Sequence, residues 1–385
     1  MNEYLKQQKN NMLQLLEKLV NIDSCSNDRD GVNQIGDIMT THFTKLGLQI
    51  NRYKNELYGD HLKFHSRTAK ASPSILIIAH MDTVFEKGTA ANRPFRIDDD
   101  KKRAYGPGVI DMKSSLVSVY YAMKALKECN SDAFHEVEIL LTSDEEVGSL
   151  TSRAIIEETA ITKKFVLVME PARKNGAIVS ARRGKGHFTL EVIGKAAHSG
   201  IEPERGRSAI EELAHKIIQL HELTDEEAGI HVNVGLIEGG TSVNTISDHA
   251  QAEIDVRFKN QEQGKVIERQ IKQISSHSEV DGTKIVIDGE INRPPMEKTD
   301  QTERLLRIIK KVGDDLQLSI IDTETGGGSD ASFPAALGIP TVDGLGPVGG
   351  NAHREDEYLE LDSFIPRTLL LAHVIEKLVF KMKKI

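Results

Sequence analysis

The hydrophobic pattern of the first half of the chain alternates between helical spacing and short, continuous apolar runs. Apolar residues recur three and four positions apart over about 3–21 and 31–46, which predicts two amphipathic helices. Three apolar runs follow, interleaved with two further helical patterns. The runs are Ile75–Ala79, Val137–Thr142 and Phe165–Met169, and the helical patterns are Met112–Leu126 and Ser149–Glu158. Strands that are apolar on both faces and alternate with helices indicate an α/β fold, with a mostly parallel sheet and helices on both faces.

The pattern changes after about residue 186. It predicts, in order, the strand His187–Ile193, the helix Ser208–His221, the strands His231–Glu238 and Ala250–Phe258, the helix Glu262–His277 and the strand Lys284–Asp288. This β-α-β-β-α-β order is that of a ferredoxin-like domain. The α/β pattern then resumes and ends in a helix at about 362–381. We therefore expect an α+β domain at 185–292, inserted between two parts of a catalytic domain at 1–184 and 293–385.

Bulk composition narrows the functional classes. The 385 residues are 39% hydrophobic and 28% charged, which is typical of a globular protein. A net charge of −9 argues against a nucleic-acid partner. The N-terminal residues lack the apolar segment of a signal peptide, and the apolar runs are too short to cross a bilayer. The two cysteines, Cys25 and Cys129, fit a reducing compartment. We expect a cytoplasmic protein with no membrane or nucleic-acid partner.

Acids and imidazoles gather where the predicted strands end. His80 ends the first apolar run, Glu145 and Glu146 follow the second, and Glu170 follows the third. The carboxyl ends of parallel strands meet at one edge of a sheet, where ligands bind. Two further side chains, Asp111 and His353, complete a set of two imidazoles and three carboxylates. Such a set suits two divalent ions, which we expect to be Zn²⁺, with Co²⁺ or Mn²⁺ as alternatives.

Several members of this set also have a simpler interpretation. His80 could be an ordinary polar strand end, Asp111 an N-cap of the following helix, and the acid run at 144–146 a solvated surface. Charge favours the metals, because the three ligand carboxylates sum to −3 and two divalent ions with one hydroxide balance them. Asp82, two positions after His80, can orient its imidazole.

A hydrolytic mechanism follows from this set. The metals would lower the pKa of a bound water and polarise a carbonyl. Glu145, beside one ligand, would take the proton of the water and deliver it to a leaving nitrogen. The bond to be cleaved is then an amide.

At these residues the chain resembles the di-zinc family of glutamate carboxypeptidases, acetylornithine deacetylases, succinyl-diaminopimelate desuccinylases, aminoacylases and peptidase T. The matching segments span nearly the whole chain in family order. They are HMDTV at 80–84, GPGVIDMK at 106–113, DEEVGS at 144–149, MEP at 169–171, GKAAHSG at 194–200, DVRF at 255–258, TGGGSDA at 325–331 and the segment around His353. TGGGSDA most resembles the glutamate carboxypeptidase branch.

The resemblance implies specific roles for the ligands. One zinc would bind His80, Asp111 and Glu170. The other would bind His353, Asp111 and Glu146. Glu145 would be the catalytic base, and a cis peptide would follow Asp111.

The resemblance also implies roles for the inserted domain. It would be a lid and a homodimerisation surface, with His198 stabilising the oxyanion in the partner subunit's active site. Outside its motif, His198 would be interpreted as a polar loop residue. Arg257 would bind the substrate carboxylate through its guanidinium, with Asn244 in the same pocket. Gly327 and Gly328 would let the backbone approach the ligand. A surface arginine and a bare turn are the simpler interpretations.

The expected function is a zinc-dependent amidohydrolase or carboxypeptidase that releases a C-terminal glutamate-like residue from a small N-acyl amino acid or short peptide. An N-acyl amino-acid deacylase of the acetylornithine or succinyl-diaminopimelate type is the alternative with the same chemistry. A catalytically silent binding protein is an alternative of another class, and the retained Glu145 argues against it. A serine hydrolase is disfavoured, because the sequence holds no G-x-S-x-G elbow.

Overall fold

The structure, a computed structural model, describes residues 1–66 and 73–382. It divides into two compact units. The first holds residues up to Ala181, Lys298–Thr325 and the chain from Ser329 onward, and the second holds Arg182–Glu297 with Gly326–Gly328. The second unit therefore begins three residues before the inserted domain expected from the sequence and ends five residues after it.

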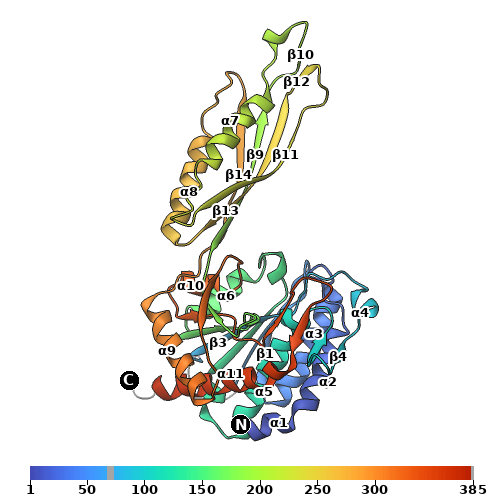
Figure 1. Cartoon of the computed structure of the whole chain (residues 1–385), viewed down its shortest axis with the longest axis vertical. Helices are drawn as coiled ribbons and strands as arrows, with labels where there is room; N and C mark the ends of the chain where they lie inside the picture. The colour runs from blue at the N-terminus through green and yellow to red at the C-terminus, as the bar shows by residue number, and fades with distance from the viewer. Residues whose placement is uncertain (67–72, 383–385) are drawn as a thin grey trace. The chain divides into compact units, whose positions relative to one another are not determined.

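The first unit is built on a six-stranded sheet of order β1-β2-β6-β3-β7-β16 (Figure 1). The strands are β1 (Leu48–Tyr53), β2 (His61–Ser66), β3 (Ile75–His80), β6 (Val137–Thr142), β7 (Phe165–Val168) and β16 (Thr341–Val342). β3 runs parallel to β6 and β7, and β16 runs parallel to β7. β1 and β2 form an antiparallel edge that the sequence analysis missed. The expected parallel centre is confirmed.

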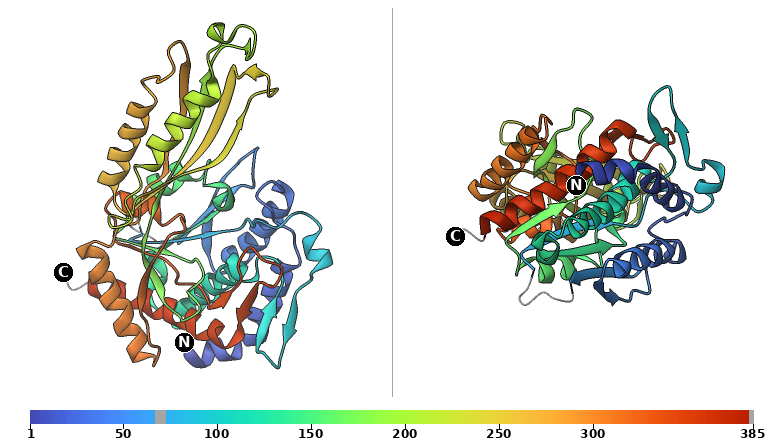
Figure 2. Two further views of the ribbon diagram at one scale, coloured as in Figure 1. Left: turned by 45° about the horizontal axis from the view of Figure 1, so that its top comes forward. Right: turned by 90° about the horizontal axis from the view of Figure 1, so that it is seen from below.

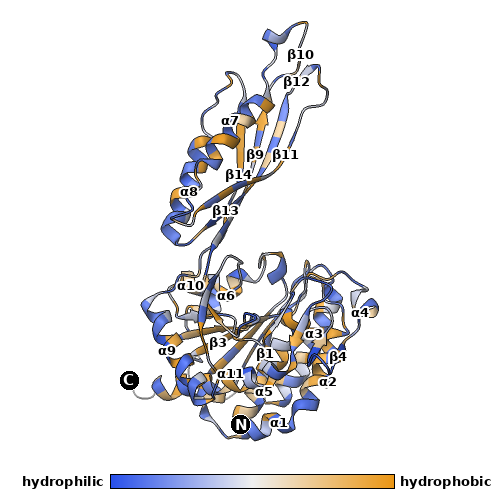
Figure 3. Ribbon diagram, in the orientation of Figure 1, coloured by the Kyte–Doolittle hydropathy of each residue, from blue (hydrophilic) through white to orange (hydrophobic). Residues whose placement is uncertain are grey.

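The central strands are buried on both faces, as their continuous apolar sequence requires. All six residues of β3 and of β6 are buried. Alternate residues of β3, such as Ile77, belong to the main hydrophobic core, whereas Ile78 is buried outside it and faces the other side. Figure 3 shows the apolar character of these strands. Both faces of the sheet are therefore covered by other elements.

Helices account for this cover (Figure 2). They are α1 (Asn2–Gln7), α2 (Lys9–Val20), α3 (Arg29–Lys45), α4 (Thr89–Asn92), α5 (Ser114–Glu128), α6 (Arg153–Ala160), α9 (Asp300–Asp315), α10 (Ser332–Ala336) and α11 (Leu361–Met382). α5 packs against α11 and contributes to the main core with α2 and α3. Phe43 of α3 packs on Phe64 of β2 and on Tyr120 of α5. α6 packs against α10 and buries Ile156 outside this core.

Three helix boundaries differ from the sequence-based expectation. The first helix is interrupted at Gln8, whose N–H approaches the carbonyls of both Tyr4 and Leu5 at 3.1 and 3.0 Å, which tightens the turn. The helix expected from Met112 begins at Ser114, because Val109–Lys113 forms a separate turn. The helix expected from Ser149 begins at Arg153.

Two smaller sheets complete the first unit. One has the order β17-β18-β5-β4, formed by β17 (Gly349–Gly350), β18 (Tyr358–Glu360), β5 (Arg103–Tyr105) and β4 (Arg96–Asp98). The other pairs β15 (Asp322–Thr325) with β8 (Ile178–Arg182). Within residues 1–66 and 73–382, no helix combines the length and the apolar character that a bilayer crossing needs.

The second unit has the expected β-α-β-β-α-β order. Its elements are β9 (Gly184–Ile193), β10 (Ala197–His198), α7 (Ala209–His221), β11 (His231–Gly239), β12 (Thr245–Ile246), β13 (His249–Phe258), α8 (Gln261–Ile274) and β14 (Lys284–Arg293). The antiparallel sheet has the order β11-β13-β9-β14. Burial alternates along β9 and β13, so one face packs under the helices. A ferredoxin-like insert is confirmed.

Candidate metal centre

The strand ends of the first unit carry the predicted ligands. His80 is the last residue of β3, Glu146 lies in a short 3₁₀ turn (Glu145–Val147) after β6, and Glu170 lies two residues beyond β7. Asp111 lies in the turn before α5, and a cis peptide joins it to Met112. His353 lies in the loop between β17 and β18. The topology therefore brings residues from five separate segments to one edge of the sheet.

Asp111 lies between the two imidazoles. His80 Nε2 is 3.2 Å from Asp111 Oδ1 and 3.6 Å from Glu170 Oε1. His353 Nε2 is 3.3 Å from Asp111 Oδ2 and 3.2 Å from Glu146 Oε2. Each oxygen of Asp111 thus faces a different histidine, and each histidine also faces one glutamate. The structure thus brings together the side chains of both ligand trios that the sequence resemblance implies.

The side chains present suit divalent cations. A carboxylate oxygen of Glu145 and one of Glu170 group with a ring nitrogen of His80, all within 4.8 Å of one another. His80, Asp111 and Glu146 form a second such group. Among the described residues, the buried Oε1 atom of Glu146 has no hydrogen-bond partner. A buried acceptor without a donor is costly, and a bound cation would satisfy it. The imidazole and carboxylate donors fit a pair of ions of the zinc, cobalt or manganese type.

The electrostatics of the cluster favour positive charge. Burial opposes protonation of His80, but hydrogen bonds to Asp111 and Asp82 and the charge of Glu170 raise its pKa well above the ordinary value. Hydrogen bonds to Asp111 and Glu146 raise the pKa of His353 to about 11. Burial, reinforced by the charge of Asp111, raises the pKa of Glu170 well above its ordinary value. Without metal, protons therefore offset the crowded carboxylates, and metal binding would release them.

Asp82 is a fully buried carboxylate behind the cluster. His80 Nδ1 lies 3.0 Å from the backbone carbonyl of Asp82 and 3.5 Å from its carboxylate, so the closer contact of the imidazole is to the backbone. The carboxylate of Asp82 accepts hydrogen bonds from the N–H groups of Glu145 and Glu146 at 3.3 and 3.1 Å and from the hydroxyl of Ser26 at 2.7 Å. Asp82 therefore contacts two strand-end segments of the site at once.

Asp144 is a second anchoring acid, one that the sequence analysis treated only as part of an acidic run. Its Oδ2 atom accepts hydrogen bonds from the N–H and hydroxyl of Thr151 at 2.6 and 2.7 Å and from the N–H of Ser152 at 3.2 Å. Its side chain is buried. The available sequence signal was the Ser and Thr residues that follow the acids, a pattern typical of turns closed by side-chain hydrogen bonds.

The second unit holds the other predicted residues. His198 of β10 is exposed and lies opposite Thr245 of β12, next to Asn244. The N–H of Gly200 donates to His198 Nδ1 at 3.1 Å, so the neutral imidazole carries its proton on Nε2. Asn244 Oδ1 accepts a hydrogen bond from the hydroxyl of Ser242 at 2.6 Å. The paired strands thus bring His198 and Asn244 together.

Arg257 and the glycine loop also lie in the second unit. Arg257 is partly exposed and pairs with Asp255 of the same strand through Nε and Nη2 at 2.9 and 3.2 Å. Arg182 is buried and donates from Nη1 to the carbonyls of Gly327 and Gly328 at 2.9 and 3.2 Å. These carbonyls therefore bind a guanidinium of the protein itself.

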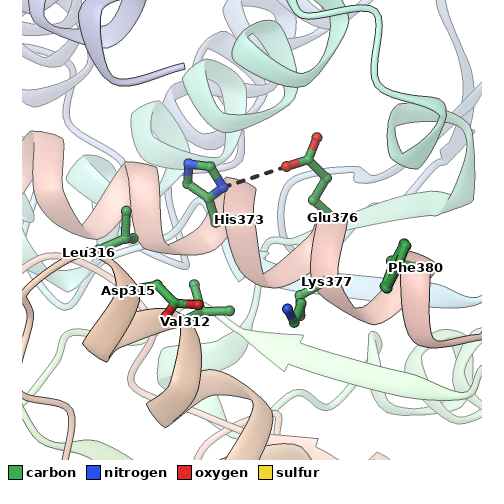
Figure 4. Close-up of a pocket in the computed structure, with 7 residues that line it drawn as sticks. All are labelled: Val312, Asp315, Leu316, His373, Glu376, Lys377 and Phe380. Carbon is green, nitrogen blue, oxygen red and sulfur yellow. Dashed lines mark ion pairs between the residues drawn. The ribbon is translucent and has the colours of Figure 1, made fainter.

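The first unit also has an open hollow of about 450 Å³ between α9 and α11 (Figure 4). Val312, Asp315 and Leu316 line it from α9 and the residue after it, and His373, Glu376, Lys377 and Phe380 line it from α11. His373 and Glu376 form an ion pair across one turn, at 3.5 Å. None of the predicted site residues is among these lining residues, so the hollow is separate from the metal cluster.

Comparisons with known proteins identify relatives of this chain. The model of "Peptidase family M20/M25/M40" matches residues 76–377. The chain is 29% identical to carboxypeptidase G2 of Pseudomonas sp. (strain RS-16) over 371 residues, covering 94% of this chain and 87% of that protein. The crystal structure of aminopeptidase PepT from Bacillus cereus superposes with a TM-score of 0.79 at 24% identity, covering 96% and 99% of the two chains.

A further solved structure shares the fold. It is the YXEP protein of Bacillus subtilis, described as a dinuclear metal binding peptidase, with a TM-score of 0.71 at 15% identity over 98% of this chain and 99% of that chain. The family model covers most of this chain, from the β3 strand to the last helix. The chain therefore belongs to peptidase family M20/M25/M40 and is a hydrolase of amide bonds.

Proposed function

We propose that this hydrolase holds two divalent ions and releases a C-terminal, glutamate-like amino acid from an N-acyl or peptidyl compound. One observation carries the two-ion part of the proposal. The two oxygens of Asp111 face His80 and His353 separately, at 3.2 and 3.3 Å, and a glutamate lies beside each histidine. A carboxylate placed between two such nitrogens is suited to bridge two ions.

The chemistry divides between the ions and the chain. When bound, the ions would supply Lewis acidity toward a carbonyl and toward a water. Glu145 would accept the proton of that water and pass it to the leaving nitrogen. Asp82 and Asp144 keep the turn of Glu145 in place through backbone hydrogen bonds. The backbone of Glu145 is thus held where a carboxylate oxygen of its side chain groups with His80 and Glu170.

His198 is proposed to stabilise the oxyanion formed during amide cleavage. Its Nδ1 atom already accepts the N–H of Gly200, which leaves the Nε2–H as a hydrogen-bond donor. An N–H donor whose ring orientation is fixed in this way is suited to a developing negative charge. We propose that it acts in the partner subunit of a homodimer. The second unit offers the edge strand β11, which exposes Leu236 and Ile237, as the dimerisation surface.

Arg257 is proposed to bind the free carboxylate of the substrate. Asp255 binds the edge of the guanidinium formed by Nε and Nη2, which fixes its orientation. A guanidinium has five N–H donors, so the Nη1 side can still bind an anion. The similarity to carboxypeptidase G2 supports the release of a C-terminal amino acid, and the TGGGSDA segment, which resembles the glutamate carboxypeptidase branch, supports a glutamate-type one. The two free cysteines of this protein, Cys25 and Cys129, support the proposal that it acts in the cytoplasm.

A substrate panel tests the proposal. Metal-loaded protein would be assayed for kcat/KM on N-acyl-glutamates, acetylornithine, succinyl-diaminopimelate and dipeptides. We expect the acyl-glutamates to give the highest value and their carboxamide analogues to be poor substrates. A preference for acetylornithine or succinyl-diaminopimelate would replace the proposed substrate by the deacylase alternative. No turnover of any amide would favour a binding protein.

Variants of Arg257 separate carboxylate binding from general effects on the lid. Arg257→Ala removes a charged hydrogen bond, which contributes about 1.5–3 kcal/mol, so kcat/KM for acyl-glutamate should fall roughly 10- to 150-fold. The loss should be much smaller for the carboxamide analogue. Arg269→Ala, at an exposed arginine of α8, is the matched control and should leave both values unchanged.

A further inference from the structure

Glu357 is a buried acid that binds the backbone of the Asp111 turn. It is 1% exposed, although it lies in a strongly polar segment. Its Oε1 atom accepts the N–H groups of Ile110 and Asp111 at 2.8 and 3.1 Å. Its Oε2 atom accepts the N–H of Gly108 at 3.2 Å. One carboxylate thus accepts three backbone N–H groups from four consecutive residues.

These N–H groups need such an acceptor. The turn Val109–Lys113 contains the non-helical residues Asp111 and Met112. The N–H of Lys113 donates to the carbonyl of Gly108, whereas the N–H groups of Ile110 and Asp111 donate to Glu357. The turn is also closely packed, because a Cβ atom on Gly108, whose φ is +71°, would lie 2.6 Å from Thr83 Cγ2. The conformation of this backbone segment is therefore restricted, and three of its N–H groups point toward the carboxylate of Glu357.

The same short segment also contacts the side chain of Asp111. His353 lies four residues before Glu357, and its Nε2 atom is 3.3 Å from Asp111 Oδ2. One segment thus contacts Asp111 twice, at the carboxylate and at the backbone N–H. At the end of the turn, the buried Lys113 donates from Nζ to the carbonyl of Ile22 at 2.7 Å.

We propose that Glu357 is a positioning residue of the metal centre, which holds the backbone of Gly108–Asp111 so that the two oxygens of Asp111 face His80 and His353. The inference rests on the proposed metal role of Asp111. Loss of the three-donor contact would let the turn relax, and the Asp111 carboxylate would no longer be fixed between the imidazoles. Partners of this kind behind metal ligands typically change metal affinity by 10- to 100-fold.

The variant Glu357→Gln tests this proposal. Glutamine keeps the volume but offers one acceptor oxygen, and its NH₂ group faces at least one backbone donor. Glu355→Gln, at an exposed acid of the same segment, is the matched control. The readouts are Co²⁺ affinity by competition with a chelator, the visible spectrum of bound Co²⁺, and thermal unfolding of the metal-free protein. We expect Glu357→Gln to weaken Co²⁺ binding about 10- to 100-fold and to change the spectrum. The control should match the wild type.

The outcomes separate this inference from the proposed function. Wild-type affinity and spectrum in Glu357→Gln, with only a lower unfolding temperature, would show a purely structural role and overturn the inference. Asp111→Asn serves as the reference for the metal centre itself. If it binds Co²⁺ like the wild type, the proposed function fails and the inference falls with it. Should Glu357→Gln not fold, Glu357→Asp is measured in its place. Its shorter carboxylate cannot span the same three donors, so weaker Co²⁺ binding supports the proposal and wild-type binding overturns it.

Discussion

Replacement of Asp82 by asparagine should destabilise the first unit strongly, although the side chain keeps its size. The wild-type carboxylate is fully buried and accepts three hydrogen bonds, from Ser26, Glu145 and Glu146. Asparagine has one acceptor oxygen. If this oxygen takes the place of Oδ2, the NH₂ group faces the N–H of Glu145, which is left unpaired.

The expected loss in the free energy of unfolding follows from these three hydrogen bonds. A buried donor without a partner costs about 1–3 kcal/mol. The two retained hydrogen bonds change from a charged to a neutral acceptor, which weakens each by about 1 kcal/mol. The free energy of unfolding should therefore fall by about 3–5 kcal/mol, a large part of the roughly 5–15 kcal/mol typical of a folded domain.

Denaturant unfolding in the presence of a chelator measures this change without any contribution from bound metal. Asp100→Asn, at an exposed acid in a turn, is the control and should stay within about 0.5 kcal/mol of the wild type. Asp82→Asn should also lower the affinity for metal, because His80, Glu145 and Glu146 all contact Asp82. An unfolding free energy for Asp82→Asn within 1 kcal/mol of the control would refute the reasoning.

Three other predictions concern the base, an ion-pair network and the glycine loop. Glu145→Gln should lower kcat by about 10²- to 10⁴-fold while metal analysis still finds the wild-type content, and retained turnover would remove Glu145 as the base. Burial raises the pKa of Asp322, but hydrogen bonds from Lys298, Lys310 and Ser180 outweigh it and lower the pKa well below the ordinary value. Its stabilising effect is therefore present above about pH 3.9 and is lost as the pH falls toward the lowered pKa. Asp322→Asn should cost about 1–3 kcal/mol at pH 7 and flatten the loss of stability between pH 5 and pH 2; an unchanged acid profile would argue against this pairing. Gly328→Ala places a Cβ atom 2.6 Å from Cδ of the buried Arg293, so thermal unfolding should show the second unit destabilised by about 1–3 kcal/mol. In the control Gly326→Ala, the added Cβ atom meets no atom within 4 Å, and stability should not change.

The sequence predicted the site best where strand ends define it. His80, Glu146 and Glu170 follow apolar runs, and parallel strands must bring such ends to one edge. Asp111 and His353 lie in irregular segments, so their place in the set was inferred from their residue types and from the other ligands, and the family resemblance supplied the division into two trios. The position of Asp111 depends on the turn Val109–Lys113, whose backbone no periodic pattern describes.

Other features could not be predicted, because long-range contacts determine them. The β1–β2 hairpin shows the alternation of a half-buried strand pair only in part, because β1 loses it at the exposed Arg52 and four of the six residues of β2 are buried. The hydrogen bond from the N–H of Asp111 to Glu357 joins residues that are 246 positions apart in the sequence. In the sequence, Glu357 is one acid among several, and nothing local distinguishes it from the exposed Glu355.

Anomalous scattering from crystals of zinc-loaded protein, measured at the zinc absorption edge, tests the central claim most directly. The account predicts two peaks about 3.5–4 Å apart. One should lie beside His80, Asp111 and Glu170, and the other beside His353, Asp111 and Glu146. A single peak, or peaks away from Asp111, would contradict the account.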